Sequence, residues 1–104
     1  MKRGEIWWAR MPGPARSRPV LLLSRDEAYA KRTQVTIAPL TRRIRELPVE
    51  VLVGRADGLP SESAVNLDNI NTIDKVALDN RITQLSPQKM AAVDSAIKFA
   101  LDLT

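Results

Sequence analysis

Only one segment of this chain repeats its apolar residues at helical spacing, and it lies at the C-terminal end. Ser86 is a favourable N-cap, and Pro87 occupies the first helical position, where its missing N–H is not needed. Apolar residues then recur every three or four positions, at Met90, Val93, Ile97 and Leu101, with Ala100 beside them. This spacing predicts an amphipathic helix from Pro87 to about Asp102 and leaves the preceding residues to strands and loops.

Short apolar segments typical of strands fill the remainder of the chain. Val20–Leu23 is continuously apolar, as in a strand buried on both faces, whereas Pro48–Val53 alternates as in a half-buried strand. Further strands are predicted over 6–9, 33–40, 63–67, 70–73 and 81–85, and a helical turn within 25–32. Three prolines make 11–19 a loop rather than a central strand. Five to seven antiparallel strands with one terminal helix predict a mainly β fold, a strongly bent sheet or partly open small barrel.

The length of 104 residues fits one domain, residues 1–104. Apolar runs such as Val20–Leu23 fall far short of the roughly 20 residues that span a bilayer. No signal-peptide core follows Met1, so we expect no membrane association and a cytoplasmic protein.

The chain contains neither cysteine nor histidine. The first absence excludes disulfides and thiolate metal sites, and the second removes the usual general base, the usual zinc ligand and any Ser-His-Asp triad. The four glycines are too scattered for a phosphate-binding loop. Asp68 and Asp74 lack the dense spacing of a hard-cation site. We therefore expect no metal and no cofactor.

Charge is distributed unevenly along the sequence. Residues 1–55 hold twelve basic and five acidic side chains, a net charge of +7, whereas residues 56–104 carry a net charge of −3. This asymmetry predicts a cationic face made by the first half, suited to nucleic acid or an acidic peptide.

Two positions in this cationic half are candidates for contacting a phosphate. Arg18 precedes Pro19, which forces an extended backbone at the start of a buried strand, so its guanidinium could hold a phosphate in two-point contact. Thr41 ends the next strong strand and is followed by Arg42 and Arg43. The alternatives are a surface arginine and a threonine that caps a turn. Antiparallel pairing in which one strand begins where the other ends would bring Arg18 and Thr41 together.

Trp7 and Trp8 must point to opposite faces of a strand. The sequence favours core or subunit-interface positions for them over the stacking of a nucleobase.

The chain resembles the MazF/PemK family of toxin endoribonucleases, the toxin half of bacterial toxin–antitoxin pairs. The matching segments run nearly end to end: Arg3–Trp8, Arg18–Leu21 with Ser24, Ala38–Thr41, Thr72–Lys75, and Leu85–Ser86 ahead of the final helix. The resemblance implies an SH3-like barrel with a C-terminal helix that works as a homodimer. It also implies metal-independent cleavage of single-stranded RNA at a short sequence, which leaves a 2′,3′-cyclic phosphate and a 5′-hydroxyl.

The resemblance also implies residue roles and partners. Arg18 matches the catalytic arginine of the family and Thr41 its catalytic threonine, and a cognate antitoxin would lay an acidic tail over the same surface. The residues expected to bind RNA around them are Arg10, Arg16, Ser24, Arg42 and Arg43. Two departures stand out: the loop Pro12–Ser17 is short and has no glutamate, and Asn71 replaces an arginine common in the family.

Two other functions stay open on the sequence. A CcdB-like gyrase poison would share the barrel, but those proteins grip their target with a tryptophan at the end of the terminal helix, and this chain ends Leu101–Thr104 without one. The other alternative is a catalytically silent barrel that binds RNA or a peptide.

Overall fold

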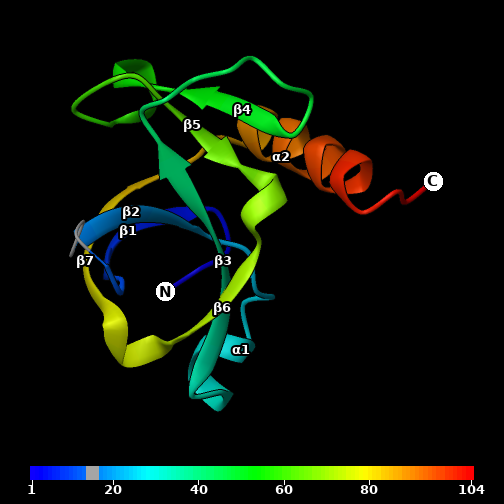
Figure 1. Cartoon of the computed structure of the whole chain (residues 1–104). Helices are drawn as coiled ribbons and strands as arrows, with labels where there is room; N and C mark the ends of the chain where they lie inside the picture. Colours follow the sequence, from blue (N-terminus) through cyan, green and yellow to red (C-terminus); the bar gives the residue numbers. More distant parts are fainter. Residues whose placement is uncertain (14–16) are drawn as a thin grey trace.

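Across residues 1–13 and 17–104, which the computed structural model describes, the chain forms seven antiparallel strands and a terminal helix (Figure 1). The strands are β1 (Glu5–Arg10), β2 (Ser17–Leu22), β3 (Gln34–Thr41), β4 (Glu50–Val53), β5 (Ser63–Asn66), β6 (Asn71–Asp74) and β7 (Leu78–Gln84). The helices are α1 (Ala28–Lys31), a single turn, and α2 (Pro87–Ala100). Three 3-10 turns, η1 (Arg55–Asp57), η2 (Leu67–Asn69) and η3 (Lys75–Ala77), lie between the later strands.

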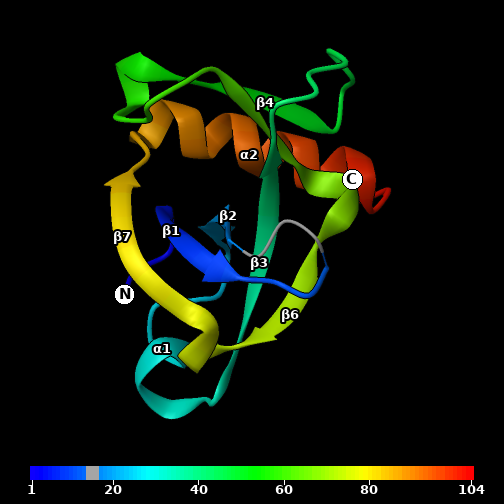
Figure 2. The ribbon, with the colours of Figure 1, turned by 60° about the vertical axis from the view of Figure 1, so that its left-hand side comes forward.

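The strands are ordered β4-β5-β3-β2-β1-β7, and β6 also pairs with β3 (Figure 2). The mainly β prediction with five to seven strands and a C-terminal helix is therefore confirmed. The strand order ends at β4 on one side and β7 on the other, so the barrel is not closed.

Strand β3 holds the sheet together because it changes partner along one edge. Its residues 34–37 pair with β6, whereas Leu40 and Thr41 pair with β5. Pro39 falls between these two ladders and is aligned with Val20 on the opposite edge. Since a proline has no N–H to donate, placing it at the change of partner leaves no ladder hydrogen bond unmade on that edge.

The prediction that residues 11–19 form a loop was wrong for its last three residues, 17–19. Strand β2 begins at Ser17, includes Pro19 and lies between β1 and β3. Pro19 is aligned with Trp8 of β1, but pairing with β3 starts only at Val20. Proline is tolerated here because on the β3 side it lies outside the hydrogen-bonded ladder.

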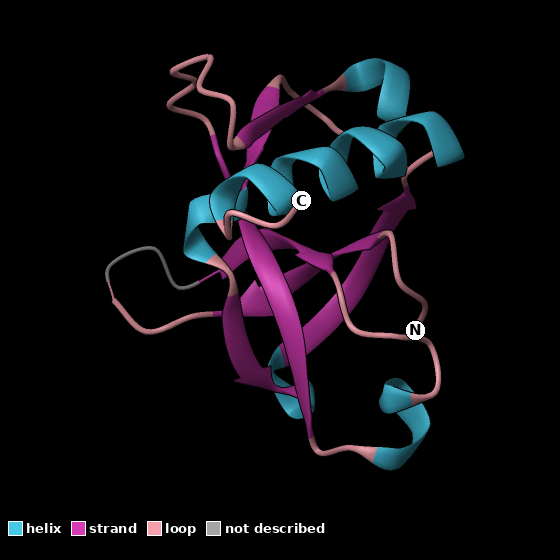
Figure 3. Ribbon diagram, turned by 90° about the vertical axis from the view of Figure 1, so that its right-hand side faces the viewer, coloured by secondary structure: helices cyan, strands magenta, loops and turns pink. Residues whose placement is uncertain are grey.

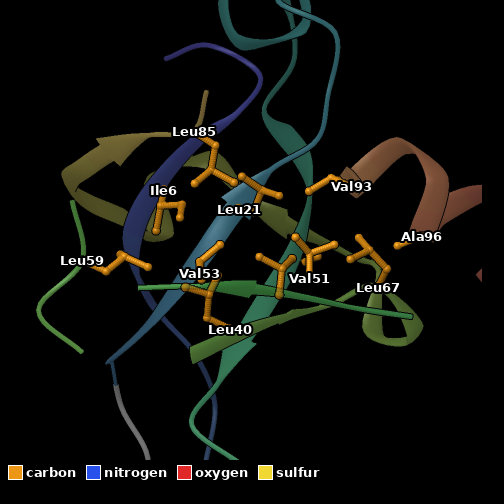
Figure 4. Close-up of a cluster of buried hydrophobic side chains, with 12 residues drawn as sticks. Ile6, Leu21, Leu40, Val51, Val53, Leu59, Leu67, Leu85, Val93 and Ala96 are labelled. Carbon is orange, nitrogen blue, oxygen red and sulfur yellow. The ribbon is translucent and has the colours of Figure 1, made fainter. Parts of the chain in front are cut away.

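Buried side chains form two clusters. The larger lies under α2 and is shown in Figure 4; its members include Ile6, Leu21, Leu40, Val65 and Val93. The smaller gathers side chains of β1, β2 and β3 around Tyr29, among them Ala9, Val20, Val35 and Ile37. Residues at alternate positions of β2 thus enter different clusters, as the continuous apolar run predicted.

Helix α2 runs beside β4 (Figure 3), and Ser86 caps it by accepting a hydrogen bond from the Lys89 backbone N–H (3.1 Å). The helix prediction is confirmed, with one correction. Val93 and Ala96 are buried, whereas the helix ends at Ala100 and Leu101, directly after it, is 56% exposed. No helix among the described residues is long and apolar enough to cross a membrane.

A buried carboxylate fastens the start of β1 to β7. Glu5 accepts hydrogen bonds from the Lys2 backbone N–H (2.9 Å), the Trp7 indole (3.0 Å) and the Arg81 guanidinium (2.9 Å). Burial by itself would raise the pKa of the Glu5 carboxyl, but these hydrogen bonds outweigh burial and hold the pKa below its ordinary value.

A carboxyl with a lowered pKa contributes stability that is present above its unfolded-state pKa and lost as pH falls through the folded-state pKa. We expect Glu5→Gln to lower the free energy of unfolding at neutral pH by about 1–3 kcal/mol. The variant should also lose less stability than the wild type on acidification. Urea denaturation at a series of pH values tests both expectations, and parallel pH curves for the two proteins would contradict the assigned role of Glu5.

Candidate active site

A cavity of about 360 Å³ opens where β2 begins and β3 ends. Four stretches of chain line it: Trp8, then Ser17–Pro19, then Leu40–Arg42, and then Leu59, Pro60, Ser61 and Ser63. Arg18 and Thr41 both belong to this lining. A larger groove of about 830 Å³ lies between β4 and α2, but neither of these two residues lines it.

The strand register explains how Arg18 and Thr41 come together. Val20 of β2 is aligned with Pro39 of β3, and the strands are antiparallel. The register, continued by two residues, sets Arg18 opposite Thr41, and side chains directly opposite each other lie on the same face of a sheet. The site is therefore made by the first residues of one strand and the last residues of its neighbour.

The hydroxyl of Thr41 is fixed by the backbone that follows it. Its oxygen accepts a hydrogen bond from the Arg43 N–H (3.1 Å), which is the turn-capping role that the sequence left open. A threonine hydroxyl can accept and donate at once, so its proton stays available to a ligand in the cavity. Capping and ligand binding are compatible for this residue.

Arg18 is exposed and forms no ion pair with any residue that the structure describes. Among the described lining residues, Arg18 and Arg42 are the only charged side chains. The cavity is therefore cationic, with no carboxylate in this lining to compete for the guanidinium groups.

Arg43 faces a neighbouring cavity of about 280 Å³. Thr41 lines both cavities and so stands at their boundary. The second cavity is polar and is lined by two cations, Arg43 and Arg45, and by two carboxylates, Glu50 and Asp68. The cationic lining is therefore that of the first cavity, on the Arg42 side of Thr41.

The other residues predicted to bind RNA lie elsewhere. Arg10 is paired with Asp79 (3.2 Å) and donates to the Val76 carbonyl, and Ser24 lies beyond the far end of β2, where its hydroxyl accepts from the Thr36 N–H (2.8 Å). Neither of them lines the cavity of Arg18. Arg16 falls outside the described residues.

The two aspartates weighed as metal ligands are separated. Asp68 lines the second cavity, whereas Asp74 accepts a hydrogen bond from the Gln34 side chain (3.2 Å) on β3. No three acidic side chains gather as a possible metal site within residues 1–13 and 17–104.

Two parts of the cavity were missed by sequence reasoning. Trp8 was favoured as a core or interface residue, but it is only half-buried and lines the cavity, whereas Trp7 packs against the smaller cluster. Within the stretch Leu59–Ser63, only Ser63 belongs to a predicted element, the strand over 63–67. The paired tryptophans and Pro60 are the sequence features that could have pointed to these two parts of the cavity. The sequence did not show that they meet beside Arg18.

The stretch Leu59–Ser63, which forms one wall of the cavity, follows a turn that is fixed by contacts with β7. Gly58 has a φ of 91°, a backbone conformation that favours glycine, and a Cβ there would come within 2.4 Å of the Thr83 hydroxyl. That hydroxyl donates to the Asp57 carbonyl (2.8 Å), so β7 fixes the turn from which the wall emerges.

Comparisons with known proteins agree with this geometry. The sequence model of the PemK-like, MazF-like toxins of type II toxin–antitoxin systems matches residues 2–101. A probable endoribonuclease MazF5 from Mycobacterium tuberculosis is 40% identical to this chain over 96% of its residues and 92% of the relative. The endoribonuclease EndoA of Bacillus subtilis is 31% identical and covers 99% of this chain and 96% of the relative.

Solved structures share the fold. The Mycobacterium tuberculosis toxin MazF-mt6 superposes with a TM-score of 0.89 at 36% identity, covering 96% of this chain and 98% of that one. A mycobacterial endoribonuclease in complex with its cognate antitoxin superposes with a TM-score of 0.88 at 27% identity, covering 100% of this chain and 97% of that one.

Proposed function

The chain belongs to the PemK-like, MazF-like toxins of type II toxin–antitoxin systems, a family of endoribonucleases, and we propose that Arg18 and Thr41 carry out the cleavage of RNA. The observation that supports this assignment is their presence in one cavity whose described lining has cations and hydroxyls but no carboxylate. The substrate is single-stranded RNA, cut at a short sequence without a metal ion.

RNA supplies its own nucleophile, so the protein does not have to provide one. The 2′-oxygen forms a bond to phosphorus as its proton leaves, the bond from phosphorus to the 5′-oxygen breaks, and the departing oxygen takes up a proton. The products are a 2′,3′-cyclic phosphate and a 5′-hydroxyl. The protein must hold the 2′-oxygen in line and stabilise the negative charge that builds on the phosphorane.

Arg18 meets the second requirement. A guanidinium is a planar, two-point donor to phosphate oxygens and is better suited to stabilising charge than to abstracting a proton. The Thr41 hydroxyl, held by the Arg43 N–H, donates a hydrogen bond to the same phosphate. Arg42 and Arg43 bind the flanking phosphates, and Arg10 and Ser24, which lie outside this cavity, stay predicted RNA contacts.

Two different surfaces are assigned to the two protein partners. An acidic antitoxin segment would compete with RNA for Arg18, Arg42 and Arg43, and its binding would silence the enzyme. A second copy of the chain would cover exposed apolar side chains such as Phe99 and Leu103, so the active species is a homodimer. It acts in the cytoplasm, where messenger RNA is found.

The direct test incubates the purified protein with RNA of mixed sequence in EDTA and maps the new 5′ ends. We expect 5′-hydroxyl ends at one short motif. Intact RNA from folded protein would contradict the proposal. Inhibition of gyrase supercoiling without RNA cleavage would favour a CcdB-like poison, and RNA binding without products would favour a silent barrel.

The flanking arginines give a salt-dependent prediction. Each phosphate that a cation neutralises on single-stranded RNA contributes about 0.7 to the slope of log Kd against log salt. We therefore expect Arg42→Ala and Arg43→Ala each to reduce that slope by about this amount, measured with an RNA that carries a 2′-deoxy sugar at the cleavage site. Arg32→Ala is a matched control, since Arg32 lines a separate cavity beside Ser24. Equal slopes for the wild type, the two arginine variants and the Arg32→Ala control would contradict the proposed phosphate contacts.

A further inference from the structure

Ser63, the first residue of β5, is a buried polar residue that lines the proposed active-site cavity. It is only 8% exposed, and its hydroxyl makes no hydrogen bond to any residue that the structure describes. Within the described residues, no side-chain oxygen or nitrogen that is sealed from solvent lacks a partner. The Ser63 hydroxyl is therefore not sealed, and it opens into the cavity with its hydrogen-bonding capacity unused.

The strand register places Ser63 beside the residue opposite Thr41, with its side chain on the other face of the sheet from the Thr41 side chain. Thr41 of β3 is aligned with Ala64 of β5, so Ser63 adjoins the residue opposite Thr41. Continued by one residue, the register sets Arg42 opposite Ser63. Ser63 is related to Arg18 and Thr41 through the cavity that all three residues line, so a group bound by Ser63 would share that cavity with a phosphate held by Arg18 and Thr41.

The surroundings of Ser63 fit a nucleobase better than a phosphate. The lining that it shares includes the apolar side chains of Trp8, Pro19, Leu40 and Leu59 beside its arginines and hydroxyls. Apolar surfaces with a few well-placed polar groups are typical of sites that bind a flat organic ring and fix its orientation. Phosphate groups are instead bound by the exposed arginines.

We propose that Ser63 determines sequence specificity by hydrogen bonding the edge of the nucleobase next to the scissile phosphate. This inference rests on the proposed function and adds a base-reading residue to it. The hydroxyl can donate or accept, so it favours bases that present a complementary group at that point of the cavity. A base without that group leaves the hydroxyl unpaired, and such a mismatch lowers the rate of reaction.

The wall that carries Ser63 is rigid enough for such discrimination. Gly58 and the hydrogen bond from Thr83 fix its start, and pairing of Ser63 with Val53 of β4 fixes its end. A hydroxyl held in this way cannot easily move to suit a different base.

The test compares the wild type with Ser63→Ala on a set of RNAs that differ only in the bases on either side of the cleaved bond. For the preferred base we expect Ser63→Ala to lower kcat/KM about 3- to 10-fold, whereas kcat/KM for the other bases changes little. Discrimination among bases should therefore fall by the same factor. Ser63→Cys, similar in size and a weak donor, should lie between the two proteins. Ser95→Ala, an exposed serine on α2, is the matched control and should behave as the wild type.

An equal loss for every base would show a merely structural role and overturn the inference. Unchanged discrimination in both Ser63 variants, with the wild type active, would overturn it while leaving the proposed function intact. A folded wild type that cleaves none of the RNAs would overturn both.

Discussion

Replacing Arg18 by alanine is expected to lower kcat for RNA cleavage by about 10²- to 10³-fold, the usual effect of removing one donor that stabilises a developing oxyanion. Arg18 lies at the start of β2, exposed to the cavity and without an ion pair among the described residues, so its guanidinium can act on the phosphate. Initial rates with a short fluorogenic RNA that contains the cleaved motif provide the measurement. Thermal unfolding should show that the variant is still folded.

The variant Arg18→Lys tests whether the planar shape of the guanidinium is needed in addition to its charge. A lysine keeps the positive charge but gives up the planar two-point contact, so we expect it to recover only a small part of the lost rate. Full activity in Arg18→Lys would contradict two-point binding of the phosphate. Since we propose that Arg18 and Thr41 act on one phosphate, the loss in Arg18→Ala combined with Thr41→Val should be smaller than the product of the single losses.

The second large effect concerns the fold that holds these groups. We expect Leu21→Ala to lower the free energy of unfolding by about 2–5 kcal/mol, a large share of the stability of a small domain. Leu21 is 0% exposed near the end of β2, aligned with Ile6 on one side and Ala38 on the other, and it belongs to the cluster that packs against α2. Removing its side chain leaves a cavity that these neighbours cannot readily fill.

Leu52→Ala is the matched control for this experiment. Leu52 lies on β4 but is 45% exposed, so its truncation should change stability by less than about 1 kcal/mol. Urea denaturation of the wild type and the two variants at neutral pH measures both effects. Similar midpoints for the two variants would contradict the assignment of Leu21 to the core.

Local patterns explain how much of the fold could be predicted from the sequence. Ser86 and Pro87 mark the start of α2, and the alternation of valines before Gly54 marks β4, because capping and side-chain periodicity depend on neighbouring residues. Arg18 and Thr41 could be selected as candidates for the same reason, since each stands at the end of a strongly apolar strand.

The remaining features depend on contacts between distant residues. Pro19 lies within a strand because β3 pairs only beyond it, which no local rule reveals. Trp8 and Ser63 meet in the cavity only after β1 and β5 have both been placed against their neighbours. Arg10 and Ser24 have sequence contexts that suit RNA binding, but Asp79 and Thr36 engage them through the tertiary structure.

The change of partner at Pro39 has a mechanical consequence. Thr41 is carried by the half of β3 that pairs with β5, whereas Arg18 is carried by β2, which pairs with β1. A rotation of the β4–β5 ribbon about Pro39 would shift the alcohol relative to the guanidinium while leaving the hydrogen bonds within each ribbon intact. The relative position of the Arg18 and Thr41 side chains therefore depends on the course of β3 at Pro39 as well as on the strand pairing within each ribbon.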